Sequence, residues 1–382
     1  MNCSTVQLVD LPDEMLIEIL KKLTNVDVLY SMLGVSQRFD RLARDAIFTH
    51  FLDLTTNTTI GERRHSMSKT LLDRFCSFIL PQIYNDIRFL ALESLSMKRI
   101  LVACDYPQLH KLKLRSIEPK VFINYLADDS SIVHIFKQIT HLEISTIGYY
   151  STESEILLNT NGYGRLFSVC QRLSHLNISG NYFRLNQPVH QYDLPLSICS
   201  SSTITALNIK VRTIDDCLCL LGGRFNQMKT LIIDIKSIED SILNIDNKSN
   251  LPNLTTFFLS SLSPTEEYDN LIVPMLRRMS NIQKLGLYLQ VENRPEFIDG
   301  TDLYNGILIY MPRIQIFFFN ITTIDDYVDK IYWYKNDDIE DTDIIDYNHP
   351  DIDCRIDYFT NGCSRCRISS KLFIKSSQLY ND

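Results

Sequence analysis

One short pattern recurs nine times in this chain and constrains its fold more than any other feature. In each copy, two variable residues separate the first apolar residue from the second, and one separates the second from the third. The copies begin at residues 87, 109, 139, 173, 204, 228, 254, 282 and 314, with a mean spacing of about 28 residues. The last two apolar positions lie two residues apart, so both face the core if the segment is a strand.

The segments between the copies have the apolar spacing of short helices. Leu166, Val169 and Cys170 form one such stripe, and Leu218, Leu221 and Phe225 form another. A strand followed by a helix, repeated at this spacing, is typical of a solenoid in which each repeat covers the next. The sequence therefore predicts an α/β fold, with a leucine-rich-repeat-like solenoid of about nine repeats over residues 87–324.

The residues before the repeats predict a small helical domain over 5–54. Leu16, Ile19, Leu20 and Leu23 form the stripe of an amphipathic helix, and Pro12 suits its first turn. A second short stripe follows, and Ser36 is placed to begin a third helix. Three helices this short make a small core, which a neighbour or partner usually completes. Residues 55–86 are expected to form a connecting helical segment.

The last region, 325–382, differs in composition from the rest. Twelve acidic residues and three basic ones lie between Asp325 and Asp357, a net charge of 3 − 12 = −9. Runs of this kind are usually solvated tails, although interleaved isoleucines suggest partial packing. We expect residues 325–382 to be an acidic segment that either caps the solenoid or forms a tail.

Charge and hydropathy exclude several functions. The net charge of −8 argues against general nucleic-acid binding, which needs clustered positive charge. No apolar run is long enough to cross a membrane, and the first ten residues lack the features of a secretory signal. We therefore expect a cytoplasmic or nuclear protein whose ten cysteines remain reduced and are mostly small buried apolar residues.

The first domain resembles the F-box. The resemblance rests on Leu11-Pro12-x-Glu14-x-Leu16-x-x-Ile19-Leu20-x-x-Leu23, followed by Asp27 and by Val35-Ser36-x-x-Phe39-x-x-Leu42. It implies docking on a Skp-type adaptor, which tethers the chain to a cullin-RING ubiquitin ligase. The residues that the resemblance assigns to adaptor binding are Leu11, Pro12, Glu14, Leu16, Ile19, Leu20, Leu23, Val35 and Phe39.

The repeats resemble the irregular leucine-rich repeats often found downstream of an F-box. Residues between the inward positions are expected to line the concave sheet face, where solenoids bind partners. The candidates for substrate binding are Lys111, Lys113, Arg115, His141, Glu143, His175, Asn177, Ile232, Phe258 and Tyr288. The first three predict a basic patch suited to an acidic or phosphorylated stretch, unless they are ordinary solvated strand residues.

The two resemblances imply a substrate-recognition subunit of an SCF-type ubiquitin ligase that binds an unknown protein substrate and has no chemistry of its own. A first alternative is a binding scaffold whose F-box recruits the adaptor without degradation. A second alternative is a metal- or thiol-dependent protein that uses Cys354, Cys363 and Cys366. No nucleophile, Walker or dinucleotide pattern is visible, so we expect neither a metal nor another cofactor.

Overall fold

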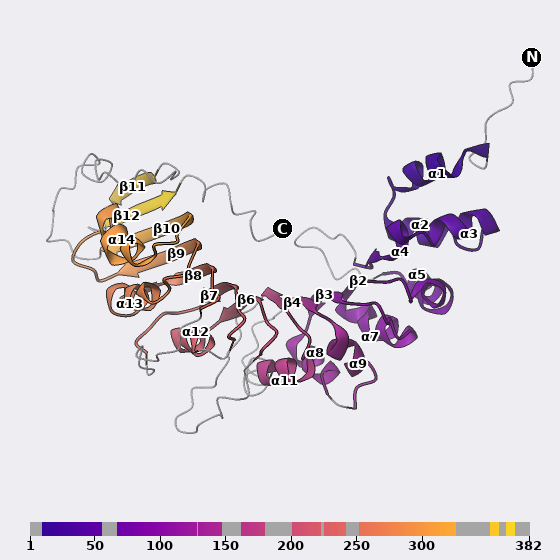
Figure 1. Cartoon of the computed structure of the whole chain (residues 1–382), viewed down its shortest axis with the longest axis horizontal. Helices are drawn as coiled ribbons and strands as arrows, with labels where there is room; N and C mark the ends of the chain where they lie inside the picture. Colours follow the sequence, from indigo (N-terminus) through magenta and orange to yellow (C-terminus); the bar gives the residue numbers. More distant parts are fainter. Residues whose placement is uncertain are drawn as a thin grey trace, which may run out of the picture. The chain divides into compact units, whose positions relative to one another are not determined.

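The computed structural model describes residues 10–55, 67–127, 129–146, 162–179, 201–222, 225–241, 252–325, 352–358 and 364–370. The chain forms two compact units. The first contains Met1–Tyr150 with Ser168–Leu173, and the second contains Ser151–Phe167 with Ser174–Asp382. Each unit combines parallel strands with helices, which confirms the α/β class (Figure 1).

The first unit begins with a helical module, residues 11–50. Its helices are α1 (Asp13–Leu20), α2 (Asn25–Met32), α3 (Gln37–Ala43) and α4 (Ala46–Thr49). The side chains of Thr24, Ser36 and Asp45 each accept a hydrogen bond from a backbone amide in the first turn of the helix that follows. Such caps satisfy amides that a helix leaves unbonded. The sequence predicted three helices here, and the Asp45 cap separates a short fourth one.

Parallel strands and helices make up the rest of the first unit. Its elements are β1 (Phe51–Asp53), α5 (Lys69–Arg74), η2 (Phe75–Ile79), α6 (Leu80–Ile83), β2 (Phe89–Glu93), α7 (Ser94–Ala103), β3 (Lys111–Ile117), α8 (Pro119–Tyr125), α9 (Val133–Gln138) and β4 (His141–Thr146). The strands pair in chain order from β1 to β4. Figure 1 shows α7, α8 and α9 on one side of them.

The second unit continues the same alternation. Its first helix is α11 (Gly162–Val169), whose last two residues are assigned to the first unit. The elements that follow in chain order are β5 (His175–Ser179), β6 (Ala206–Val211), α12 (Ile214–Leu221), β7 (Thr230–Ile235), β8 (Thr256–Thr265), η3 (Tyr268–Ile272), α13 (Val273–Arg277), β9 (Lys284–Glu292), α14 (Gly300–Gly306), η4 (Leu308–Tyr310), β10 (Ile316–Asp325), β11 (Ile352–Tyr358) and β12 (Ser364–Ser370). Strands β5 to β10 pair in parallel. β12 pairs antiparallel with β10, and β11 pairs antiparallel with β12.

The nine copies of the sequence pattern correspond to the nine strands β2 to β10. The last two apolar residues of every copy, such as Leu112 and Leu114 in β3, are at most 5% exposed. The strand residue between them is partly exposed and faces away from the core in seven of the nine copies, and the exceptions are buried Ala91 and Gly286. This alternation confirms the predicted strand positions and leaves one face of each unit's strands for polar and partly exposed side chains.

Three strands lie outside the repeated pattern. β1 precedes the first copy and falls inside the range that the sequence assigned to the helical domain. β11 and β12 belong to the C-terminal segment and cover the edge of β10. Without them, β10 would leave its backbone groups unpaired at that edge, a common site of unwanted pairing between chains.

A recurring hydrogen-bond arrangement joins the starts of neighbouring strands. In the second unit the carbonyls of Ser174, Thr205, Lys229, Thr255 and Gln283 each accept bonds from two successive amides of the next repeat. The carbonyls of His50, Arg88 and His110 do the same in the first unit. This backbone ladder satisfies the turns of the repeats without a repeated side chain, and it holds neighbouring strands in a constant register.

Two buried tyrosines allow a matched test of side-chain hydrogen bonding. The hydroxyl of Tyr106 donates to the Ile100 carbonyl at 2.5 Å, whereas the buried hydroxyl of Tyr268 has no hydrogen-bond partner among the described residues. We expect Tyr106→Phe to lower the free energy of unfolding by about 1 kcal/mol, and Tyr268→Phe to leave it unchanged or raise it by about 1 kcal/mol. Urea unfolding followed by circular dichroism measures both. Equal losses in the two variants would contradict the assignment.

Candidate functional site

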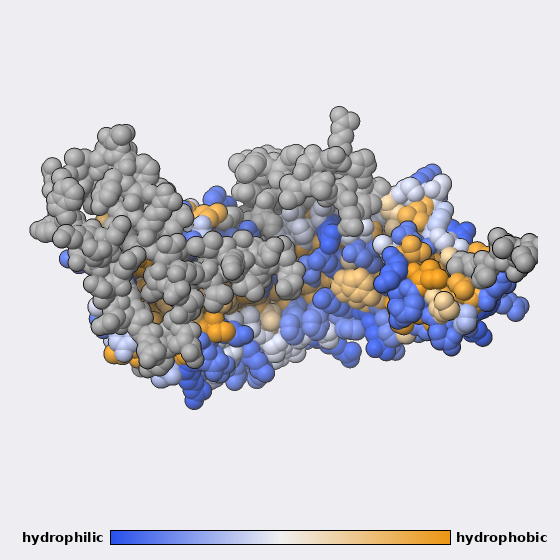
Figure 2. All heavy atoms as spheres, turned by 90° about the horizontal axis from the view of Figure 1, so that it is seen from above, coloured by the Kyte–Doolittle hydropathy of each residue, from blue (hydrophilic) through white to orange (hydrophobic). Residues whose placement is uncertain are grey.

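The outer side of α1 presents apolar side chains to solvent. Met15 is 52% exposed, Ile19 is 43% exposed and Leu23, just past the helix, is 46% exposed. These three residues are four positions apart and follow one side of the helix, with exposed Pro12 at its start. Figure 2 shows hydrophobic residues gathered over this helix. We call Pro12, Met15, Ile19 and Leu23 the α1 ridge, and a ridge of this kind indicates an interaction surface.

Three residues predicted to bind an adaptor lie in the core instead. Leu16 is 1% exposed, Leu20 is 2% exposed and Phe39 is 7% exposed. Leu16 and Phe39 pack with Leu42, and partly buried Leu11 packs against this group. Their assignment as contact residues is therefore corrected, because buried side chains support the surface without forming it. Glu14 is exposed and Val35 is 62% exposed, so both side chains are accessible to a docking partner.

Ion pairs hold α1 against α3. One oxygen of Asp13 lies 2.7 Å from Arg38 Nη2, and the other lies 2.5 Å from Arg41 Nη2. The hydrogen bond from Arg38, followed by the charges of Arg38 and Arg41, holds the pKa of Asp13 below its ordinary value. Asp13 therefore stays ionised at neutral pH and fixes the start of the α1 ridge.

The helical module is also tied to the helix that follows it. The Arg74 guanidinium lies over the ring of Tyr30 at 5.0 Å and over the ring of Phe78 at 5.4 Å, and it donates to the Leu33 carbonyl at 2.9 Å. Gly34 has a φ of +87°, a conformation that favours glycine, and a Cβ there would lie 3.2 Å from Phe78. These contacts position exposed Val35 beside α5 and η2.

The open strand face of the first unit carries five of the predicted substrate-binding residues. Lys113 Nζ lies 2.5 Å from a Glu143 carboxylate oxygen, and Arg115 is in register with Glu93. Lys111 lies over the ring of Phe89 at 5.3 Å, and half-buried His141 packs edge-on against His110.

The basic patch predicted from these residues is corrected to a mixed one. The three cations share their face with Asp53, Glu93 and Glu143, which occupy the same or neighbouring registers. Three positive and three negative side chains on the described strands balance each other, so these strands carry no excess positive charge to attract an acidic stretch. The sequence alone did not reveal this, because all three acidic residues lie on strands other than β3, and only the fold brings them alongside its cations.

The open face of the second unit carries the other five predicted substrate-binding residues. His175 and Asn177 lie on β5, Ile232 on β7, Phe258 on β8 and Tyr288 on β9. All except exposed His175 are half-buried. The register aligns Asn177 with Asn208, Ile232 and Phe258, so the fold brings these predicted residues into one row across the strands.

Comparison with known proteins adds no assignment. Neither protein-family models nor curated proteins match this sequence. Within the described ranges, no helix has the length and apolar character to cross a bilayer, and no group of three or more His, Cys, Asp or Glu side chains is arranged to hold a metal ion. The functional argument therefore depends on the surfaces themselves.

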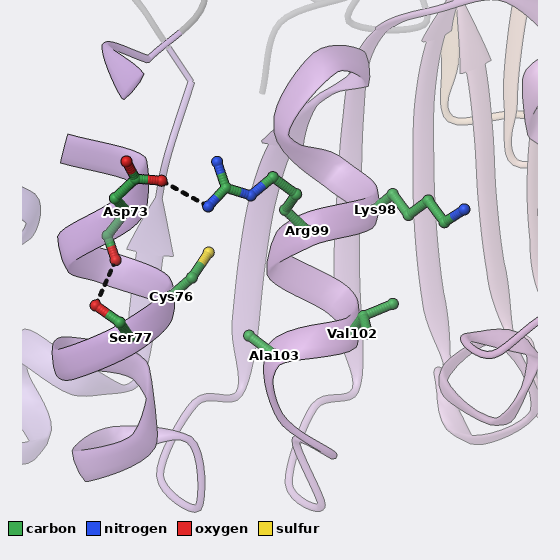
Figure 3. Close-up of a pocket in the computed structure, with 7 residues that line it drawn as sticks. All are labelled: Asp73, Cys76, Ser77, Lys98, Arg99, Val102 and Ala103. Atoms are coloured by element: carbon green, nitrogen blue, oxygen red, sulfur yellow. Dashed lines mark hydrogen bonds and ion pairs between the residues drawn. The ribbon is translucent and has the colours of Figure 1, made fainter. Parts of the chain in front are cut away.

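A hollow of about 650 Å³ lies between α5–η2 and α7 in the first unit (Figure 3). Arg99 reaches across it to Asp73, with Nη2 2.7 Å from Oδ1, and the Cys76 thiol points into the same space. Burial raises the pKa of Cys76, although the Arg99 charge opposes the shift. The thiol is therefore protonated at neutral pH, which does not suit a nucleophile, and the described residues that line the hollow include no histidine to activate it.

The cysteines of the thiol-dependent alternative lie near the C-terminus. Cys354 is on β11 opposite Ile368, and Cys366 is on β12 opposite Ile356. They are thus two positions apart across an antiparallel pair, and Cys363 lies outside the described residues.

Proposed function

We propose that the chain is a substrate-recognition subunit of a cullin-type ubiquitin ligase, with the helical module docking on a Skp-type adaptor. The α1 ridge carries this proposal, because it exposes Met15, Ile19 and Leu23 on a module whose core is already filled by Leu16, Leu20 and Phe39. Burying each large apolar side chain contributes about 1.5–3 kcal/mol, enough for a short helix to anchor a complex.

The strand faces supply the second half of the proposal. Each unit leaves one face with half-buried polar and aromatic side chains, away from the helices. Such faces suit protein partners, and the hollow beside Cys76 lacks the groups that would favour an enzyme. The chain would then act by holding a partner close to the ligase, which raises the effective concentration of the reacting groups.

The adaptor test uses exposed residues only. We expect Met15→Glu with Ile19→Glu to weaken binding of a purified Skp-type adaptor at least about a hundredfold, because both apolar contacts are lost and charges replace them. Biolayer interferometry with the full chain measures this. The matched control is Leu95→Glu with Val102→Glu on α7, where the side chains are 62% and 52% exposed. Equal binding by both variants would contradict docking through the α1 ridge.

A second measurement separates degradation from scaffolding. A chain that binds the adaptor but leads to no transfer of ubiquitin onto any captured protein, in a reaction with cullin, RING subunit and conjugating enzyme, supports the non-degradative alternative. Metal analysis of the purified chain tests the alternative based on Cys354, Cys363 and Cys366. A stoichiometric metal ion lost in a variant with all three cysteines changed to serine would favour it.

A further inference from the structure

The open face of the second unit contains an aromatic shelf. Across β7 to β10, one row of register partners consists of Ile232, Phe258, Gly286 and Phe318. The rings of Phe258 and Phe318 are stacked with their centroids 6.4 Å apart. They come from β8 and β10, which are separated by β9. We call Ile232, Phe258 and Phe318 the aromatic shelf.

Gly286 makes this arrangement possible. A Cβ at this position would lie 2.1 Å from Phe258 Cδ1, so the Phe258 ring occupies the space that any side chain on β9 would fill. The ring therefore lies over the backbone of the neighbouring strand and approaches Phe318. Phe258 and Phe318 both remain half-buried, so part of each ring is exposed.

Polar groups around the shelf define what it would bind. Lys284, two residues before Gly286 on β9, is exposed, and no hydrogen bond or ion pair joins its side chain to the described residues. Lys210 and Asp234, in contrast, neutralise each other at 3.0 Å. Within the described part of the chain, Lys284 therefore provides an unpaired positive charge beside the aromatic rings, and this charge favours a negative group on the partner.

Two buried acceptors lie on the same face. Asn177 Oδ1 on β5 and Asp234 Oδ1 on β7 are shielded from solvent and receive no hydrogen bond from the part of the chain that the structure describes. A buried acceptor without a donor is unfavourable, and a partner whose binding shifts the neighbouring side chains and supplies N–H groups relieves it. The backbone of an extended peptide presents such donors at regular intervals. From β5 to β9 the strands span about 19 Å, which about six extended residues cross.

We infer that this face binds an extended peptide segment of a partner protein, with an aromatic side chain on the shelf and an adjacent acidic side chain at Lys284. The inference rests on the proposed role of the repeats in holding a protein partner and specifies which partners fit. It does not depend on the adaptor or on the α1 ridge.

The test is selection from a random-peptide display library on the full chain. We expect enriched peptides to carry Phe, Tyr or Trp next to Asp or Glu. Selection on Lys284→Glu is expected to replace the acidic residue with Lys or Arg, and a selected wild-type peptide is expected to bind that variant about fivefold more weakly or worse. The double variant Phe258→Ala with Phe318→Ala is expected to bind the same peptide at least about tenfold more weakly, and peptides selected on it are expected to show no preference for aromatic residues.

The control is Lys229→Glu, the same charge change at an exposed residue immediately before β7, outside the row of Lys284. It is expected to select the wild-type peptides. Circular dichroism confirms that each variant is folded. Identical peptides from wild type and the double alanine variant would overturn the inference, as would an absence of enrichment on the folded chain.

A concentration-dependent dimer that the double alanine variant abolishes, with no peptide selected, would assign the face to a second copy and also overturn the inference. Loss of adaptor binding in the α1 ridge variants is measured separately. Failure here and failure of the ligase proposal are therefore distinguishable.

Discussion

Replacing Leu16 and Leu20 with alanine is expected to release α1 from the helical module, whereas Met15→Glu with Ile19→Glu is expected to leave it folded. The two pairs are one residue apart on the same helix. Leu16 and Leu20 are 1% and 2% exposed, whereas Met15 and Ile19 are 52% and 43% exposed. Each buried leucine is expected to contribute about 2–5 kcal/mol, so the double change removes about 4–10 kcal/mol from the packing of α1.

The loss is expected to be local, because α1 packs on a small core. Leu16 contacts a group formed with Phe39 and Leu42, and the ion pairs of Asp13 with Arg38 and Arg41 are too exposed to replace that packing. Hydrogen–deuterium exchange measures the result. Amides of α1 should lose protection in the leucine variant, while those of β3 and β4 keep it. Unchanged protection of α1 in that variant would contradict the burial described above.

The same helix shows how far periodicity alone predicts a site. Leu16, Ile19, Leu20 and Leu23 are a single apolar stripe in the sequence, and a stripe indicates that one side of the helix is apolar. It does not indicate where the core ends and the surface begins. The fold divides the stripe between buried Leu16 and Leu20 and exposed Ile19 and Leu23, and adds Met15, which lies just outside the stripe. Met15 was missed for that reason.

The strands were more predictable than the site. Each copy of the repeat places two apolar residues on one face, and nine copies reduce the chance of error, so β2 to β10 follow from the pattern alone. β1, β11 and β12 contain no copy of the repeat, so their sequences did not predict them. They form strands by pairing with the edge of a neighbouring strand.

Contacts between strands could not be predicted in the same way. Glu143 neutralises Lys113 from the next strand, and Gly286 admits the ring of Phe258 from its neighbour. These relations depend on register, which the sequence of one strand does not contain.

Alkaline pH is expected to destabilise both units, and buried thiols and phenols are the cause. The first unit contains Cys170 and Tyr106, and the second contains Cys217 and Tyr268; all four are at most 2% exposed. Burial raises the pKa of Cys170 from its ordinary 9.0 to about 12. It also raises the pKa of Cys217, Tyr106 and Tyr268.

The direction of the effect follows from these shifts. A raised pKa means that the folded chain keeps its proton where the unfolded chain has lost it. The stability contribution is therefore complete below the ordinary pKa and declines as the pH rises toward the folded value. For Cys170 this window runs from about pH 9 to about pH 12. Each group is expected to lower the free energy of unfolding by about 1 kcal/mol per pH unit within its window. The window of the thiols begins at a lower pH than that of the phenols.

Urea unfolding of the full chain between pH 7 and pH 11 under reducing conditions measures this decline, with circular dichroism as the signal. Cys170→Ala with Cys217→Ala removes two of the titrating groups. The variant is expected to be less stable than wild type at pH 7, because small cavities remain, yet to lose stability more slowly above pH 9. The matched control is Cys76→Ala with Cys104→Ala, whose thiols are only partly buried. Burial raises the pKa of these two thiols less than that of Cys170 or Cys217, so the decline of the control is expected to lie closer to that of wild type. If the Cys170 and Cys217 variant declined as steeply as wild type, the buried thiols would not be the source of alkaline sensitivity.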